Sequence, residues 1–200
     1  MLGFLLIVSA ALAQNSYHQP WRPQYHFTPS HNFMNDPNGM VFYKGEYHLF
    51  YQFNPEGQVW GHMSWGHAVS TDMVHWKHLP LAIPEDPGYM IYSGSAVVDW
   101  NNSSGLCKNP DPQDHSCLIA IYAADYHQKR EKTHIAYSND RGRTWTNYAG
   151  NPVIDVDAED FRVCVLVCAA EKMGTGGSAR RSPQGGVLLV HRFEALDQAE

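Results

Sequence analysis

The sequence contains no cluster of lysine and arginine, since its 14 basic residues are spread among 20 acidic ones and the net charge is −6. Nucleic acids and anionic membranes are bound by grouped positive charge, so the composition argues against both as partners. After the first residues there is also no apolar run long enough to cross a bilayer as a helix. Hydrophobic residues make up 44% of the chain and aromatic residues 12%, which excludes a disordered protein and predicts a packed core.

The longest apolar run lies at the N-terminus, over residues 2–13, and ends in Ala-Leu-Ala. It is too short to cross a bilayer, and we interpret residues 1–13 as a secretory signal peptide. Because no Lys or Arg precedes the apolar part, a buried N-terminal segment is the alternative. A secreted, extracellular protein agrees with two overlapping Asn-x-Ser patterns at Asn101 and Asn102, of which one is expected to carry a glycan.

Cysteine is scarce, with four residues in the chain. Cys107 and Cys117 bracket a loop rich in proline and aspartate, and an oxidising compartment favours a short-range disulfide between them. Two free thiols are the alternative. Cys164 and Cys168 are assigned no role.

Short apolar segments are separated by turn residues, and no helical period is present before residue 162. Such segments are typical of β-strands. The sequence therefore predicts an all-β chain. The predicted strands cover residues 40–43, 46–52, 65–70, 75–83, 93–99, 118–123 and 132–137.

Two parts of the chain repeat each other. Ser70 and Asp72 recur 68 residues later as Ser138 and Asp140. Each pair is preceded by a histidine and followed by a tryptophan and an apolar strand (His67, Trp76 and 81–83, then His134, Trp145 and 152–154). A repeated strand, capped turn and packing tryptophan is typical of β-propeller blades. Chance similarity between two hairpins is the alternative.

The stretch at residues 36–39, Asp-Pro-Asn-Gly, by itself predicts a tight β-turn. The next thirty residues, however, are rich in aromatic and amide side chains, which offer apolar faces with polar tips. A carbohydrate ring requires this combination, because it has C–H faces and a rim of hydroxyl groups. The aromatic and amide residues are Phe42, Tyr43, Tyr47, Phe50, Tyr51, Gln52, Phe53, Asn54, Trp60 and Trp65.

With these motifs the chain resembles glycoside hydrolase family 32, the invertase or β-fructofuranosidase group. The resemblance covers about residues 19–162 and implies a five-bladed β-propeller, which is usually followed by a β-sandwich. The chain would hold about two blades and the start of a third, and no sequence for the sandwich. The motifs are Met-Asn-Asp-Pro-Asn-Gly at 34–39, Tyr-Gln-Phe-Asn-Pro at 51–55, Trp-Gly at 60–61 and Tyr-Ser-Gly-Ser at 92–95.

The resemblance also implies site residues. Retaining glycosidases use a carboxylate nucleophile and a protonated carboxylic acid on either side of the scissile bond. By resemblance Asp36 is the nucleophile, in a turn that opens the innermost strand of blade one and would point it at the propeller axis. A surface turn with a solvated, inert carboxylate is the alternative. Core packing is the alternative for Gln52 and Trp60, and ordinary turn chemistry for Ser93. The implied substrate ligands are Asn35, Gln52, Trp60, Tyr92, Ser93 and Arg162.

The general acid of the family, a Glu beside a Cys, has no counterpart here. Val163 follows Arg162 where the family has Asp, and the tail 163–200 contains one aromatic residue. Glu171 and Glu194 lie in this tail and neither is assigned the role. Because loss of one catalytic group costs several orders of magnitude, the chain as written is expected to be inactive. The tail is interpreted as a gene-model artefact, with a natural truncated isoform as the alternative.

The predicted organisation is a signal peptide (1–13), the N-terminal part of a propeller (14–162) and an unmatched tail (163–200). The predicted function is hydrolysis of terminal β-D-fructofuranosides such as sucrose, a small-molecule sugar, without a cofactor or metal. A non-catalytic fructoside-binding pseudoenzyme is the alternative. A third hypothesis is a metal site at His62, His67, His75 and His78, whose spacing fits neither a helical pair nor a short-spaced zinc pattern.

Overall fold

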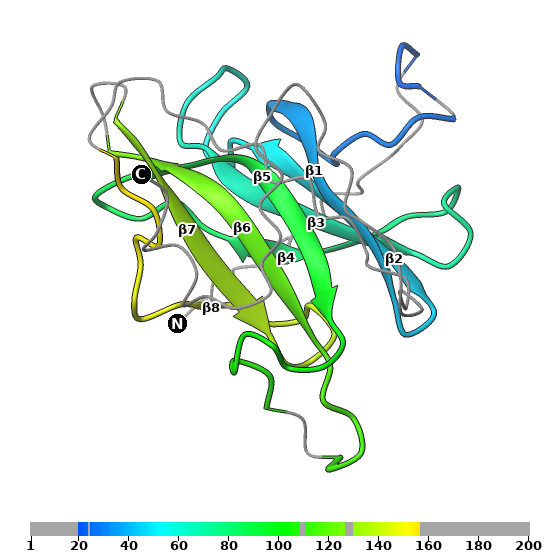
Figure 1. Cartoon of the computed structure of the whole chain (residues 1–200). Helices are drawn as coiled ribbons and strands as arrows, with labels where there is room; N and C mark the ends of the chain where they lie inside the picture. Colours follow the sequence, from blue (N-terminus) through cyan, green and yellow to red (C-terminus); the bar gives the residue numbers. More distant parts are fainter. Residues whose placement is uncertain (1–19, 24, 109–110, 127–129, 157–200) are drawn as a thin grey trace, which may run out of the picture.

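The computed structural model describes residues 20–23, 25–108, 111–126 and 130–156, which fold into two four-stranded antiparallel sheets (Figure 1). The strand orders are β1-β2-β3-β4 and β5-β6-β7-β8, so each sheet is an up-and-down meander, as in a propeller blade. The all-β fold class is confirmed. The strands are β1 (Met34–Tyr43), β2 (Glu46–Phe53), β3 (Ser64–Ser70), β4 (Lys77–Ile83), β5 (Met90–Asp99), β6 (Cys117–Asp125), β7 (Glu131–Ser138) and β8 (Thr146–Asn147).

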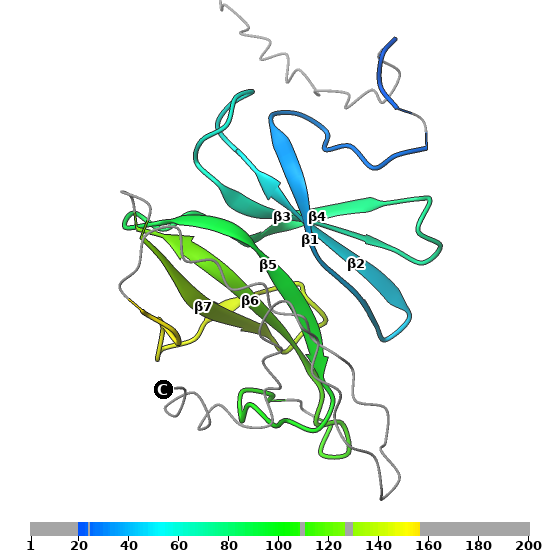
Figure 2. The same cartoon turned by 45° about the horizontal axis from the view of Figure 1, so that its top comes forward.

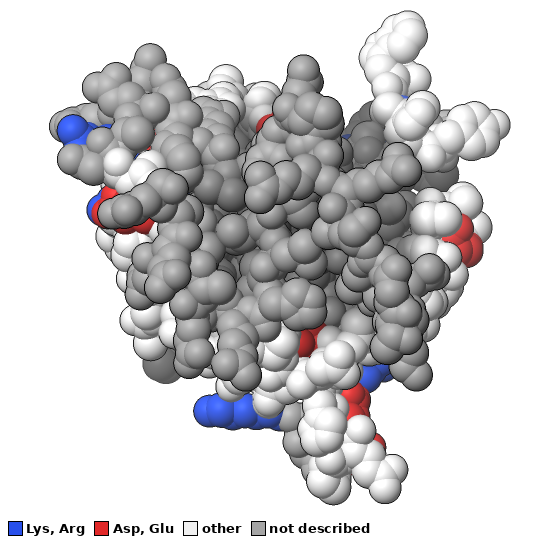
Figure 3. All heavy atoms as spheres, in the orientation of Figure 1, with Lys and Arg blue, Asp and Glu red and all other residues white. Residues whose placement is uncertain are grey.

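The part of the chain that the structure describes holds no helix that is long and apolar enough to cross a membrane. Where described residues are visible in Figure 3, the basic side chains lie in small separate groups, and some of these have acidic side chains beside them.

The expected turn at residues 36–39 is wrong, because these residues lie inside β1. The strand is irregular there, with register shifts between Met34 and Pro37 and between Asn38 and Val41. β1 is an outer strand of its sheet, and an outer strand can accept a proline that has no N–H to donate. The turn signal therefore marks a bulged start of β1.

The second sheet also departs from the predicted repeat. Residues 152–154, the expected fourth strand, contribute only an isolated bridge between Ile154 and Thr133, and β8 has two residues. The side chain of Asn151 replaces backbone pairing here, since its amide accepts from Ile135 N at 2.9 Å and donates to Ile135 O at 2.8 Å. The β7 edge is thus satisfied by a side chain instead of a continuous strand.

The repeated turn recurs in detail. Ser70 Oγ accepts from Met73 N at 2.8 Å, and Ser138 Oγ accepts from Gly142 N at 2.8 Å. The two tryptophans, Trp76 and Trp145, each donate from Nε1 to the carbonyl oxygen three residues earlier, at 3.2 Å in both cases.

The histidines of the two repeats do not correspond. His67 stacks on Phe50, whereas 68 residues later the equivalent strand position is Ile135, in a second core cluster. His134 precedes this equivalent position by one residue, and its ring contacts Tyr89 and Tyr122. Because a shift of one residue turns a strand side chain to the opposite face, the two histidines lie on different faces of their blades.

The main core lies where the two sheets pack side by side (Figure 2). Phe50 is fully buried between His67 and Trp145, with ring centroids 4.3 and 5.4 Å away. Side chains of both sheets interleave, so the first sheet is not independent of the second. The buried members of this cluster are Phe50, Trp65, Ala82, Ile83, Ile91, Ala96, Ala120, Tyr122, Ala124 and Ala136.

Two glycines allow β1, β5 and β6 to approach closely. A Cβ on Gly39, which has φ +46°, would lie 2.7 Å from the backbone N of Ala96 in β5. A Cβ on Gly94 would lie 2.1 Å from the carbonyl oxygen of Ile121 in β6. No side chain fits at either position without displacing backbone, so glycine is required where the sheets meet.

Polar contacts join the two sheets at the outer end of β1 and β2. Glu46 Oε2 and Oε1 accept from Arg141 Nη2 and Arg143 Nη2, both at 2.8 Å, across about 95 residues of sequence. The hydrogen bond from Arg143 holds the pKa of Glu46 below its ordinary value. Nearby, the hydroxyl groups of Tyr43 and Ser116 are 2.9 Å apart. The two arginine contacts fix the β7–β8 turn against the β1–β2 hairpin, and the Tyr43–Ser116 contact joins the end of β1 to the segment before β6.

We predict that Gly39→Ala destabilises the protein more than the matched variant Gly45→Ala. Gly45 also has positive φ, +84°, but a Cβ there would meet nothing within 4 Å. Gly45→Ala should therefore lower the free energy of unfolding by only about 1 kcal/mol, because alanine is strained in a left-handed backbone conformation. Gly39→Ala should lower the free energy of unfolding by about 2 kcal/mol more than Gly45→Ala does, because its Cβ would clash with Ala96 of β5. Denaturant unfolding measures both, and equal losses would contradict the close approach.

The second prediction concerns pH and rests on His48 and His67, which are both buried, with His48 Nδ1 and His67 Nε2 3.1 Å apart. Burial lowers the pKa of His48 to about 4 and that of His67 to about 3. Both rings are therefore neutral in the folded protein near pH 6, while an unfolded histidine takes up a proton near pH 6.5. Their contribution to stability is present above pH 6.5 and is lost as the pH falls toward 4.

The measurement is the free energy of unfolding between pH 7 and 4. Each buried histidine should lower it by up to about 1.4 kcal/mol per pH unit in this range. The variant His67→Phe keeps an aromatic ring and should flatten the slope, while His115→Phe, at an exposed position, should leave it unchanged. An unaltered slope in His67→Phe would show that the pair is not the cause.

Candidate active site

The beginning of β1 and the beginning of β5 bring two predicted site residues together. Asp36 and Ser93 are both exposed, and Ser93 Oγ donates a hydrogen bond of 2.9 Å to Asp36 Oδ2. The two residues are 57 positions apart in sequence and belong to different sheets. The hydrogen bond occupies one oxygen of the exposed Asp36 carboxylate, and its donor, the Ser93 hydroxyl, is uncharged.

Beside this carboxylate lies a buried amide pair, Asn38 and Gln52, with 2% and 3% exposure. The Asn38 amide lies 3.3 Å from Gly94 N, and with the amide turned end for end its oxygen lies 3.2 Å from Nε2 of Gln52. Gln52 is thus packed inside the blade next to the β1–β5 junction. The sequence pattern gives no sign of this role for Asn38, because Asn in Asp-Pro-Asn-Gly is typical of a turn.

The connection between β2 and β3 carries Trp60, whose side chain is 55% exposed. Buried Asn54 orders this connection: its Oδ1 accepts from Glu56 N at 2.8 Å and its Nδ2 donates to Val59 O at 2.8 Å. The Trp60 ring meets that of Tyr92 edge to face, with centroids 6.3 Å apart. The arrangement presents an indole face to solvent next to the beginning of β5.

His62 ties the same connection to the segment between β4 and β5. Its Nδ1 lies 2.9 Å from Glu85 Oε2 and its Nε2 lies 3.7 Å from Glu56 Oε2. The backbone of Glu85 is held as well, since its N–H donates to Ser64 Oγ at 2.9 Å. The hydrogen bond to Glu85 raises the pKa of His62, and the two carboxylate charges add to the effect.

The histidines considered as metal ligands have separate surroundings. His67 lies in the core against His48, exposed His75 pairs with Asp72 at 2.7 Å, and His78 packs on Phe27. Within the described ranges no group of three or more His, Cys, Asp or Glu side chains could hold a metal ion. The geometry therefore offers nothing to support a metal centre at these histidines.

The loop after β5 and the first residue of β6 carry the cysteine and asparagine residues noted in the sequence. Cys107 and Cys117 are joined by a disulfide, with Cα atoms 5.2 Å apart. Asn102 uses both ends of its amide on Cys107, accepting from its N at 2.9 Å and donating to its O at 3.2 Å. Asn101 is exposed. Arg162 lies outside the described residues, as do Glu171 and Glu194.

Known proteins are similar to this chain in sequence and in fold. The model of the "Glycosyl hydrolases family 32 N-terminal domain" matches residues 26–164. A levanase of Bacillus subtilis is 54% identical over 168 residues, covering 81% of this chain and 24% of the levanase. An invertase of Schizosaccharomyces pombe is 43% identical over 156 residues, covering 76% of this chain and 27% of the invertase.

The crystal structure of an exo-inulinase from Aspergillus awamori superposes with a TM-score of 0.64 at 46% identity, covering 69% of this chain and 29% of the exo-inulinase. The chain therefore spans about a quarter of the length of these relatives. The residues matched by the family model, 26–164, include both described sheets.

We predict that His62 titrates above the ordinary histidine value of 6.5, because Glu85 stabilises its protonated form. The ion pair is present at acidic pH and is lost as the pH rises through the raised pKa of His62. Glu85→Gln should lower this pKa more than Glu56→Gln, since Glu56 is farther from the ring and more exposed. A histidine NMR titration decides this, and a His62 pKa at or below 6.5 would contradict the contact.

Proposed function

The chain belongs to glycosyl hydrolase family 32, and we propose that it supplies the nucleophile and part of the sugar site of a β-fructofuranosidase. Such an enzyme releases terminal β-D-fructofuranosyl units from substrates such as sucrose. The observation that carries the proposal is the accessible Asp36 carboxylate, held by Ser93 from the neighbouring sheet. Relatives named levanase, invertase and exo-inulinase support the same class of substrate.

The proposed reaction is a double displacement with retention of configuration. Ser93 donates to Oδ2 and thereby orients the Asp36 carboxylate, which leaves Oδ1 to attack the anomeric carbon. The C–O bond to the leaving group breaks as a covalent fructosyl-enzyme forms, and a general acid protonates the leaving oxygen. Water then attacks the anomeric carbon and gives a proton to the conjugate base of that acid, which releases fructose and restores the free carboxylate and the acid. The acid is not among the described residues.

The proposed sugar site surrounds this carboxylate. The exposed Trp60 indole offers an apolar face, with Tyr92 packed against its edge. Exposed Asn35 offers an amide donor and acceptor for hydroxyl groups. Gln52 is buried beside Asn38 and contributes from within the blade, by supporting the strand that carries Asp36. Arg162 completes the proposed set.

Two further properties belong to the proposal. The protein is secreted after removal of residues 1–13, which agrees with the disulfide between Cys107 and Cys117. Of the two glycosylation acceptors, Asn101 is favoured over Asn102, because the amide nitrogen of Asn102 is used within its loop. The second candidate function, a non-catalytic fructoside-binding protein, would use the same exposed indole without the acid.

The proposal is tested by sequencing the transcript across codons 162 and 163 and assaying the encoded protein for fructose release. Joining of Arg162 to Asp-Pro and a later Glu-Cys pair would support the enzyme. If the transcript encodes residues 163–200 as written, the enzyme proposal fails for this product. Binding of sucrose without fructose release would then favour the pseudoenzyme.

We predict that Asp36→Asn lowers kcat of the active product by at least about 1,000-fold, since the amide cannot act as the nucleophile. KM should change little, because the size and polarity of the side chain are kept. Asp111→Asn, an exposed residue of the 107–117 loop, is the matched control and should retain full activity. Retained fructose release by Asp36→Asn would remove Asp36 from the mechanism.

A further inference from the structure

Ser93 lies at a break in the pairing of β5 with β6. The register shifts between Ile91 and Gly94, so that Tyr92 and Ser93 together oppose a single residue of β6. Such a bulge changes the direction of its side chains and interrupts the ladder of backbone hydrogen bonds. Just before the bulge, the N–H of Ile91 donates to Met63 O of the first sheet at 2.9 Å. The place of the Ser93 hydroxyl therefore depends on what holds the bulge itself.

The bulge is held from the first sheet by Trp65 of β3. The indole Nε1 of Trp65 donates a hydrogen bond of 2.9 Å to the carbonyl oxygen of Tyr92, the residue directly before Ser93. With the Asn38 amide turned end for end, its oxygen lies 3.3 Å from the same Nε1. Asn38 follows Asp36 by two residues in β1. A single N–H group thus lies between the two strands that carry the candidate site.

The indole ring of Trp65 is fixed in the core. It is fully buried, and its ring centroid lies 5.6 Å from that of Phe50 in its own sheet and 6.0 Å from that of Tyr122 in β6. A buried indole N–H requires an acceptor, because an unpaired buried donor is costly. Phenylalanine would fill much of the same space but has nothing to donate. The core therefore directs one polar contact at the bulge.

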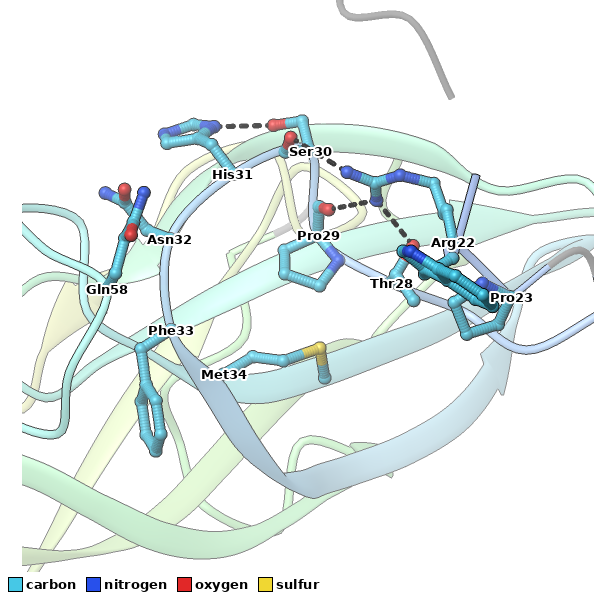
Figure 4. Close-up of a pocket in the computed structure, with 11 residues that line it drawn as sticks. Arg22, Pro23, Thr28, Pro29, Ser30, His31, Asn32, Phe33, Met34 and Gln58 are labelled. Carbon is cyan, nitrogen blue, oxygen red and sulfur yellow. Dashed lines mark hydrogen bonds between the residues drawn. The ribbon is translucent and has the colours of Figure 1, made fainter. Parts of the chain in front are cut away.

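The strand that carries Asp36 is held by other contacts. Figure 4 shows the N-terminal arm, residues 20–33, where it lines an open groove and leads into β1. At the end of the arm, Phe33 N donates to Gly57 O at 3.0 Å, which attaches the entry to β1 to the connection after β2. This contact does not involve Trp65. Loss of the indole N–H is therefore expected to move the hydroxyl donor more than the carboxylate.

We propose that Trp65 is a positioning residue for the pair formed by Asp36 and Ser93. It acts through the Tyr92 carbonyl, which fixes the bulge and thereby aims the Ser93 hydroxyl at Asp36 Oδ2. The inference rests on the proposed function, because it takes Asp36 to be the nucleophile. Trp65 is fully buried and cannot touch a substrate. Its N–H therefore supports the chemical step and has little effect on the binding of sucrose.

The test replaces Trp65 in the active product of the transcript. Trp65→Phe removes the N–H and part of the ring. Replacement of Trp65 by β-(3-benzothienyl)alanine removes the N–H alone, because sulfur takes the place of nitrogen in a ring of similar size. Trp145→Phe is the matched control, since its Nε1 also donates to a carbonyl, that of Gly142, and its ring packs against Phe50. Initial rates are measured on sucrose, and denaturant unfolding gives the stability of each variant.

We expect both substitutions at Trp65 to lower kcat about 10-fold, with KM for sucrose within twofold of the parent. Trp145→Phe should leave both constants within twofold. A normal kcat in the benzothienyl variant would overturn the proposal, because the loss in Trp65→Phe would then come from missing ring volume and not from the hydrogen bond.

A double substitution separates positioning through Ser93 from an independent effect. Ser93→Ala should lower kcat by a similar factor, and adding Trp65→Phe to it should lower kcat no further, because both act on one contact. Two independent effects would multiply to about 100-fold. A double variant as slow as that would overturn the proposal.

The positioning role and the enzyme can fail separately. Fructose release with unchanged kcat in the benzothienyl variant would reject the positioning role and leave the β-fructofuranosidase intact. If the parent releases no fructose, the enzyme proposal fails, and crystal structures of the parent and the benzothienyl variant decide the positioning role. The distance from Ser93 Oγ to Asp36 Oδ2 should then exceed about 3.5 Å in the variant, beyond hydrogen-bond range. A retained bond would reject Trp65 as its support.

Discussion

The close approach of β1 to β5 is the constraint on which the candidate site depends. Gly39 lets the backbone of β1 pass directly over Ala96, and Gly94 lets β5 lie against β6. At this junction Asp36 of the first sheet meets Ser93 of the second. A Cβ at Gly39 would lie 2.7 Å from the backbone N of Ala96, so β1 and β5 could not approach each other as closely. Asp36 and its donor Ser93 thus come together because the two sheets pack closely.

The contacts that hold the blades together are of two kinds. In the middle, aromatic rings such as Phe50, Trp65 and Trp145 are packed together and exclude water. At the outer end, Glu46 binds two arginines of the β7–β8 turn. Apolar burial supplies most of the stabilisation, since exposed ion pairs contribute little. The charged contacts join the β7–β8 turn to the β1–β2 hairpin, at the end of β1 away from Asp36.

The sequence predicts much of this arrangement. Strand segments follow from apolar runs between turns, and the Ser-Asp-Trp repeat predicts two similar meanders, because each turn is stabilised by contacts within a few residues. Local patterns could not reveal that residues 36–39 lie in a strand, since an outer strand accepts Pro37 only by virtue of its place in the sheet. The replacement of a strand by the Asn151 side chain and the His62–Glu85 contact likewise depend on chain distant in sequence.

The junction at Gly39 and Ala96 has a consequence for recombination between relatives. An exchange point in the segment between β4 and β5 would look natural, because it separates two complete meanders. In such a chimera, however, Asp36 and its hydrogen-bond donor at position 93 would come from different parents. Gly39 would also pack against a β5 strand from the other parent. A chimera built at that point has compatible halves only if one parent supplies glycine at position 39 and the other supplies a small residue at position 96. The two described sheets therefore have to be exchanged together, although a single four-stranded sheet is the unit that repeats along the chain.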